Sequence, residues 1–190
     1  MNRGNDRRTV FHGAGDYGEF MRLFDEAHEL VPLPVLAFCL MPNHFHVVAR
    51  PARIGDVSCW MKWLLTTHAT RFHLRNSTTG HVWQGRFKSF PVEPGPHLLT
   101  VLRYVERNPV RACLVRRSID WPWSSAAVRL HEEPAGWLAA LPDYRPPHWS
   151  AWVDEIDEPD DLLERLRTSV NEQRPFGTLD WTINSALTGV

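Results

Sequence analysis

Cysteine is scarce in this sequence of 190 residues, and its three cysteines (Cys39, Cys59 and Cys113) form no CxxC pair. Such a set supplies neither a disulfide framework nor a thiolate zinc site, so we expect a protein of the reducing cytoplasm. Long apolar runs are also missing. The longest, residues 31–41, contains two prolines and is far shorter than the roughly 20 residues of a membrane-spanning helix. These absences exclude a disulfide-stabilised secreted domain and predict no membrane partner.

Acidic residues are unevenly distributed. Residues 1–130 contain 17 Lys and Arg against 10 Asp and Glu, whereas residues 131–190 contain 4 against 12. Residues 50–117 are the most basic, with 12 against 3, and aromatic residues such as Trp60 and Trp83 lie among them. This pattern is typical of a phosphate-binding surface with base-stacking platforms. It equally describes a solvated basic face balanced by an acidic tail, and charge alone does not separate the two.

The acidic tail suggests a hypothesis of its own. Residues 132–164 could lie against the basic surface and compete with DNA. Removal of everything after Leu130 should then raise the affinity for DNA at low salt.

The order of predicted elements indicates an α+β fold. We expect strands at 8–12, 35–40 and 44–49, the last two joined by a turn at Pro42-Asn43, and an extended segment at 80–92. Helices are predicted at 17–30, 59–74 and 96–105, with another starting near Ser124. This alternation favours an antiparallel sheet with helices on one face. We divide the chain into a domain of residues 1–130 and a helical or irregular acidic extension, residues 131–190, with a helix at 159–170.

Two histidines two positions apart lie on the predicted strand 44–49. Side chains at i and i+2 of a strand point the same way, so His44 and His46 can reach one metal ion while Phe45 faces the opposite layer. A pair of surface or hydrogen-bonded histidines would give the same pattern, so the spacing alone does not establish a metal site.

The helix that ends near Asn108-Pro109 offers further groups. Tyr104 and Asn108 are four residues apart and share a helix face, and the Asn108 carbonyl oxygen suits a hard cation such as Mg or Mn. A nearby cation together with Arg103 or Arg107 would favour the Tyr104 phenolate, a competent nucleophile toward a phosphodiester. A core tyrosine near a helix end is the alternative interpretation.

Four ordered motifs then carry a family resemblance. They are Met-Pro-Asn-His-Phe-His-Val-Val at 41–48, His-Val-Trp-Gln-Gly-Arg-Phe-Lys-Ser at 81–89, Tyr-Val-Glu-Arg-Asn-Pro-Val-Arg-Ala at 104–112 and Trp-Ser-Ser at 123–125. The sequence closely resembles the REP-associated tyrosine transposases, a branch of the insertion-sequence-200-like, single-tyrosine HUH transposases. The resemblance covers about residues 3–125, and Arg-Pro-Phe-Gly at 174–177 is similar to a tail element of that family.

The resemblance implies a ferredoxin-like α+β fold with His44 and His46 on a central strand, Tyr104 as nucleophile and Asn108 as third ligand of a divalent metal, Mg or Mn. It implies single-stranded DNA with short hairpins as substrate and a 5′-phosphotyrosine intermediate. We select Arg86, Lys88, Arg107 and Arg111 as phosphate contacts, because they lie within and beside the motifs.

The sequence departs from the family pattern in two places. Members carry a strand upstream of the residues that Arg3-Gly4-Asn5 resemble, so we expect a truncated first strand, reflecting either a start recorded downstream of the real one or a degraded copy. His68 and His73 also stand where members often have Tyr and Asn.

The leading hypothesis is a metal-dependent single-strand DNA endonuclease and strand transferase, associated with the bacterial nucleoid in the cytoplasm. The alternatives are a catalytically impaired hairpin-DNA-binding protein and a two-histidine metallohydrolase that uses activated water. The family includes dimers and monomers, which leaves a homodimer open.

Overall fold

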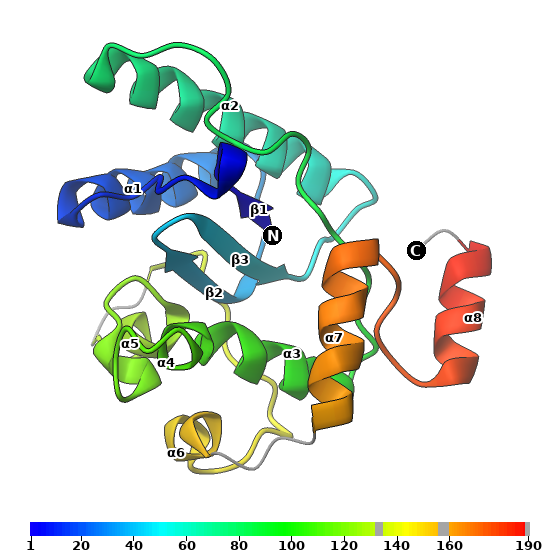
Figure 1. Cartoon of the computed structure of the whole chain (residues 1–190). Helices are drawn as coiled ribbons and strands as arrows, with labels where there is room; N and C mark the ends of the chain where they lie inside the picture. Colours follow the sequence, from blue (N-terminus) through cyan, green and yellow to red (C-terminus); the bar gives the residue numbers. More distant parts are fainter. Residues whose placement is uncertain (132–134, 156–159, 189–190) are drawn as a thin grey trace.

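A three-stranded antiparallel sheet with strand order β1-β3-β2 lies at the centre of the computed structural model, which describes residues 1–131, 135–155 and 160–188 (Figure 1). The predicted α+β class is confirmed. The elements are, in order, β1 (Asn2–Arg3), η1 (Asn5–Arg7), α1 (Ala14–Leu30), β2 (Val35–Met41), β3 (His44–Ala49), α2 (Asp56–Asn76), α3 (Pro96–Glu106), α4 (Asn108–Arg111), η2 (Ser118–Asp120), α5 (Ser125–Val128), α6 (Trp149–Asp154), α7 (Asp160–Glu172) and α8 (Leu179–Thr188).

The hairpin of β2 and β3 is the core of the sheet. Its strands pair from Val35 with Ala49 to Met41 with His44, and the turn at Pro42-Asn43 joins them as predicted. Every residue of β2 is buried. A strand that is apolar at every position packs against a layer on each face.

Helices α1 and α2 cover one face of this hairpin (Figure 1). The apolar residues of α1 recur every three or four positions, as expected for an amphipathic helix. Those that are buried are Tyr17, Phe20, Leu23, Phe24 and Ala27. They pack with Trp60 and Leu64 of α2 against Phe38 and Phe45 of the sheet.

The opposite face is covered as well, which corrects the prediction of helices on one face. Leu36, Cys39 and Met41 of β2 pack against Leu102 and Val105 of α3, and Figure 1 shows α3, α4 and α5 across the sheet from α1 and α2. Alternation of elements along the chain does not say on which side each helix lands. The unbroken apolar sequence of β2 was the signal for two covered faces.

The edge of the sheet beyond β3 is irregular. The predicted truncated first strand is β1, which pairs Asn2 with Phe45 and is bonded along its other side to the irregular segment 82–88. The predicted strand at 8–12 is wrong. Val10 and Phe11 are buried there, but both donate their backbone N–H to the Pro42 carbonyl, at 2.8 and 3.0 Å, so they form no ladder.

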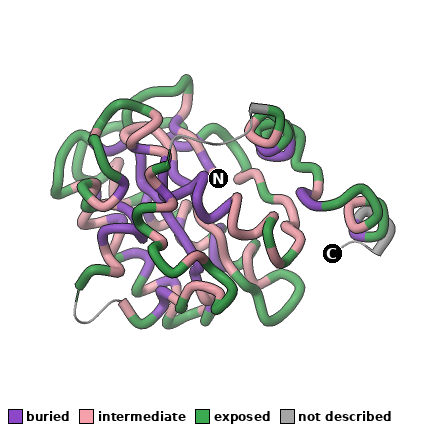
Figure 2. The backbone as a smooth tube through the Cα atoms, turned by 90° about the horizontal axis from the view of Figure 1, so that it is seen from below, coloured by how far each residue is buried: buried purple, intermediate pink, exposed green. Residues whose placement is uncertain are grey.

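Residues beyond 130 pack against both faces of the sheet. Trp137 and Leu138 join the core beneath α1, whereas Leu166, Val170 and Phe176 join the cluster around α3. The predicted helix at 159–170 is α7, although residue 159, like residues 132–134 of the hypothesised acidic tail, lies outside the described residues. Residues 179–184 of α8 are exposed or half-buried, as Figure 2 shows. Within the described part of the chain, no helix has the length and apolar character needed to cross a membrane.

His68 is an unusual member of the core. It is 1% exposed and lies among the rings of Phe11, Phe20, Phe72 and Trp83, with the Phe20 centroid 4.9 Å away. None of the described residues offers either ring nitrogen a hydrogen bond. Burial, with a smaller contribution from Arg75, lowers the pKa of His68 to about 4. The folded protein therefore keeps this imidazole neutral.

This environment predicts a pH-dependent stability contribution. The unfolded chain takes up a proton on residue 68 near pH 6.5 and the folded chain only near pH 4, so stability falls as the pH drops through this window. His68→Phe lacks this titration. The difference in free energy of unfolding between the variant and the wild type should therefore shift in favour of the variant by about 2 kcal/mol from pH 7.5 to pH 5. Urea unfolding at the two pH values measures this difference. The same gain in the exposed-site control His131→Phe, or no gain in His68→Phe, would contradict the assignment.

Candidate active site

The two histidines of β3 share one face of the sheet. The ring centroids of His44 and His46 lie 5.1 Å apart, while Phe45 between them is fully buried and packs against Phe20 and Trp83. Strand alternation thus directs both imidazoles to the side on which α3 packs.

Tyr104 of α3 meets this pair. Its ring lies edge-on to that of His46 with centroids 5.8 Å apart, and the residue is 9% exposed. The guanidinium of Arg111 lies over the Tyr104 ring, 4.2 Å from its centroid. The cation beside the phenol is therefore Arg111, in place of the Arg103 or Arg107 expected from the sequence. Arg103 instead stacks on Trp152.

Asn108 lies just after a break in the helix. Helix α3 ends at Glu106, and α4 begins at Asn108, whose side chain turns back on the preceding turn. Its Nδ2 donates to the carbonyl of Tyr104 at 2.8 Å. The Oδ1 atom is the remaining acceptor of the amide, and Asn108 lines the same cavity as His44, His46 and Tyr104.

Both histidines have a neutral imidazole, whose free lone pair can bind a metal ion. Burial, Arg3 and the N-terminal ammonium lower the pKa of His44 to about 4, and burial followed by His44 lowers that of His46 well below its usual range. Both rings are therefore neutral near pH 7. The Nδ1 of His44 lies 2.7 Å from Oδ1 of Asn43, which fixes the tautomer with Nε2 as the acceptor.

This donor set fits a divalent cation. Two neutral imidazoles and one amide oxygen form a mixed nitrogen and oxygen site of the kind that binds first-row divalent metals. The described residues contain no group of three or more His, Cys, Asp or Glu suited to hold a metal. Asn108 is therefore the residue that would complete the set with His44 and His46.

These groups line a cavity of about 520 Å³, and several arginines line it as well. Arg3, Arg7, Arg111 and Arg167 line it. Of these four, only Arg111 was predicted from the sequence as a phosphate contact. Arg3 belongs to the Arg-Gly-Asn sequence that resembles the family pattern, and this resemblance could have indicated its role at the site. No local pattern distinguishes Arg167, which lies far away in the acidic extension.

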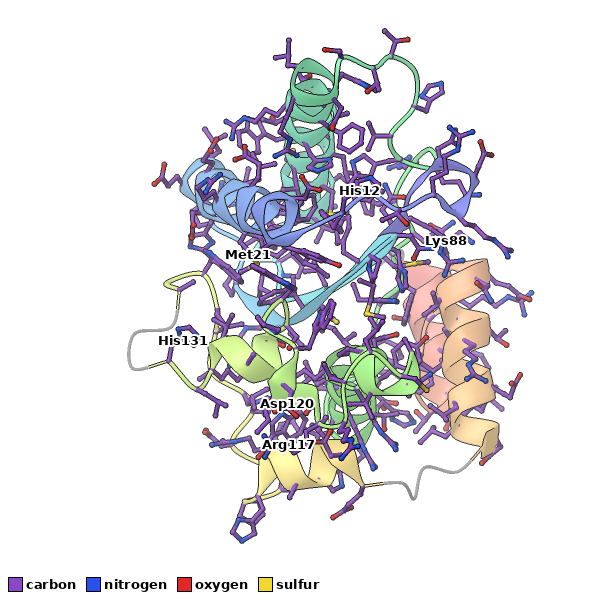
Figure 3. All side chains as sticks on the ribbon, turned by 60° about the vertical axis from the view of Figure 1, so that its left-hand side comes forward. His12, Met21, Lys88, Arg117, Asp120 and His131 are labelled. Atoms are coloured by element: carbon purple, nitrogen blue, oxygen red, sulfur yellow. The ribbon has the colours of Figure 1, made fainter. Side chains whose placement is uncertain are left out.

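The other selected phosphate contacts lie elsewhere. Arg86 is exposed, with its guanidinium 6.0 Å from the Phe87 ring. Arg107 is 9% exposed and does not line the cavity. The Nζ of Lys88 donates to the carbonyl of Asn171 in α7 at 2.8 Å, and Figure 3 labels Lys88 beside the end of that helix.

Glu106 holds α3 in place behind the site. It is fully buried and accepts hydrogen bonds from Ser125 Oγ at 2.5 Å and Trp149 Nε1 at 2.7 Å, with Arg129 Nε at 3.6 Å. Burial raises the pKa of the Glu106 carboxyl, and the hydrogen bonds and the Arg129 charge oppose this rise. Glu106 was not predictable from the sequence, because no local pattern marks a glutamate as buried.

Comparison with known proteins gives concordant matches. A family model described as transposase, IS200-like, matches residues 1–108. A REP-associated tyrosine transposase of Haemophilus influenzae is 25% identical over 121 residues, which cover 58% of this chain and 69% of the relative. A solved REP-associated tyrosine transposase, bound to a REP hairpin, matches with a TM-score of 0.56 and 19% identity, over 73% of this chain and 81% of its own. At that identity the likeness shows the fold alone.

The donor set predicts metal binding that can be measured directly. Titration of the full chain with Mn²⁺ in a calorimeter should give one saturable site, which His44→Ala and His46→Ala remove. Asn43→Ala should weaken binding about tenfold, because outer hydrogen bonds orient the ligand ring. The exposed-histidine variant His81→Ala is the control. Unchanged binding in both ligand variants would refute the site.

Glu106 predicts a stability effect. Its replacement by alanine leaves the buried donors of Ser125, Trp149 and Arg129 without their acceptor, so Glu106→Ala should lose about 3 kcal/mol in free energy of unfolding. Urea denaturation measures the loss. Asp120→Ala, at an exposed ion pair with Arg117, should leave stability nearly unchanged. Equal losses in the two variants would argue against the buried network.

Proposed function

Because this chain belongs to the IS200-like transposase family, we propose that it is a metal-dependent endonuclease and strand transferase for single-stranded, hairpin-forming repeat DNA. One observation carries the proposal: Tyr104, the two histidines of β3 and Asn108 line a single cavity together with four arginines. A nucleophile, a metal-ligand set and positive charge for phosphates are thereby combined in one chain.

The proposed reaction starts with attack of the Tyr104 hydroxyl oxygen on the phosphorus of a phosphodiester. The new O–P bond replaces the bond to the 3′ oxygen, and the proton lost by Tyr104 is balanced by the one that the 3′ oxygen gains. The 5′ end then stays attached to Tyr104 as a phosphotyrosine. Attack by the 3′ hydroxyl of another strand end reverses these bonds and joins the two strands, so no nucleotide cofactor is consumed.

The residues of the chain support this step in distinct ways. A divalent metal, Mg or Mn, held by His44, His46 and Asn108 would polarise the phosphate and offset the charge that develops on its oxygens. The Arg111 guanidinium over the Tyr104 ring places a positive charge beside the attacking group. The Asn108 hydrogen bond to the Tyr104 carbonyl fixes the end of α3 and so the position of its hydroxyl.

The substrate follows from the family and from the charge. The related structure holds a REP hairpin, and we propose a hairpin with single-stranded flanks as the substrate of this chain also. Repeats of this kind belong to the bacterial chromosome, and we propose that the protein acts there, with the nucleoid in the cytoplasm. One chain supplies the proposed nucleophile and the three proposed ligands, which supports cleavage by a single copy.

The test is covalent capture of DNA. The full chain, Mn²⁺ or Mg²⁺ and a labelled hairpin oligonucleotide should yield a protein–DNA adduct on a denaturing gel, and Tyr104→Phe should abolish it. Tyr144→Phe, a tyrosine variant outside the cavity, is the matched control. Removal of the metal with EDTA should also abolish the adduct.

Other outcomes identify the alternatives. An adduct that survives Tyr104→Phe would refute the nucleophile assignment. Tight binding without any adduct would favour a hairpin-binding protein that has lost catalysis. Cut products with no protein attached would favour hydrolysis by activated water.

A further inference from the structure

The cavity around Tyr104 is electrostatically one-sided. Arg3, Arg7, Arg111 and Arg167 line it, and none of the described lining residues is acidic. Such a group of guanidinium side chains suits a polyanion, since each offers planar paired donors to phosphate oxygens.

Arg167 comes from an unexpected part of the chain. It lies on α7 in the extension, where acidic residues outnumber basic ones by 12 to 4. The charged side chain that this acidic segment contributes to the cavity is nevertheless an arginine. The residue therefore opposes the hypothesis that the extension acts at this site as a competing acidic surface.

Helix α7 is held firmly beside the cavity. Leu166 and Val170 are buried in the cluster around α3. Lys88 donates to the Asn171 carbonyl, and the backbone N–H of Ser89 donates to Gln173 Oε1 just beyond the helix. Arg167 and Asn171 are one turn apart and both line the cavity, so this docking sets the direction of Arg167.

The carboxylate of Glu164, which pairs with Arg167 in the structure, competes only weakly with a phosphate. Arg167 Nη1 lies 3.1 Å from Glu164 Oε1, and the two side chains are 50% and 71% exposed. Ion pairs between residues this exposed contribute little and are screened by salt. A phosphate entering the cavity can therefore take over the guanidinium at small cost.

We propose that Arg167 binds a backbone phosphate of the DNA strand in the cavity, so that the C-terminal extension forms part of the DNA-binding site. This inference rests on the proposed function for the class of ligand, single-stranded DNA. It adds a contact outside the four sequence motifs and outside the residues that the family model matches, 1–108.

Salt dependence of binding tests the proposal without any cleavage. Anisotropy of a fluorescent hairpin with a single-stranded flank, measured in EDTA, gives the affinity of the full chain over a range of salt. Arg167→Ala should weaken binding about tenfold at low salt and reduce the slope of log K against log salt by about 0.7, the value for one single-strand phosphate contact. Arg167→Lys should keep the slope.

The matched control is Arg22→Ala. Arg22 is likewise an exposed arginine in an ion pair three residues apart, with Glu19, but it lies on α1. Figure 3 labels its neighbour Met21 well away from α7. This variant should keep the wild-type affinity and slope.

A second variant tests the competition with Glu164. Glu164→Gln should tighten binding in the wild-type background and have no effect in the Arg167→Ala background, because it acts by releasing Arg167. An equal gain in both backgrounds would overturn this link.

Two further results would overturn the proposal. Arg167→Ala with wild-type affinity and slope would show that no phosphate lies at this residue. Tighter binding or faster adduct formation in Arg167→Ala would show that α7 obstructs the site. Because the assay needs no catalysis, failure of the wild type to form a phosphotyrosine would leave the slope test intact, and the two failures are distinguishable.

Discussion

The candidate site depends on the alternation of side chains along β3. Phe45 fills the core beneath α1 and α2, so its neighbours on the strand must face the layer that contains α3. His46 thereby meets the Tyr104 ring. The site therefore requires helices on both faces of the sheet. If only one face were covered, the two histidines would lie in solvent, away from α3 and Tyr104.

Hydrogen bonds to a buried carboxylate fix the position of α3 on the side away from the cavity. Glu106 points away from the cavity into a network with Ser125, Trp149 and Arg129, which ties α3 to α5, α6 and the chain beyond α5. A buried carboxylate is costly unless its partners are complete, so the network tolerates little displacement. The buried carboxylate of Glu106 therefore lies on the face of α3 opposite to Tyr104 and the cavity.

Much of the fold and the site follows from local pattern. The hairpin, α1 and α3 were predictable because their apolar patterns are clear. The positions of His44, His46, Tyr104 and Asn108 were predictable because strand and helix spacing fixes which side chains share a face. Interactions between distant segments were not predictable. The 8–12 segment reads as a strand but gives its N–H groups to Pro42, and the approach of Arg167 and Arg111 to one cavity depends on the packing of α7 and α4.

The amide of Asn108 has one further consequence. Its nitrogen closes the last turn of α3 by bonding the carbonyl of Tyr104, while its oxygen is the atom available to a cation. Aspartate would be the stronger ligand, but it has no N–H to give that carbonyl, and glutamine would carry the same amide one methylene farther away. A single side chain would thus combine helix termination with the proposed metal ligation, which would account for a neutral residue where hard cations more often find a carboxylate.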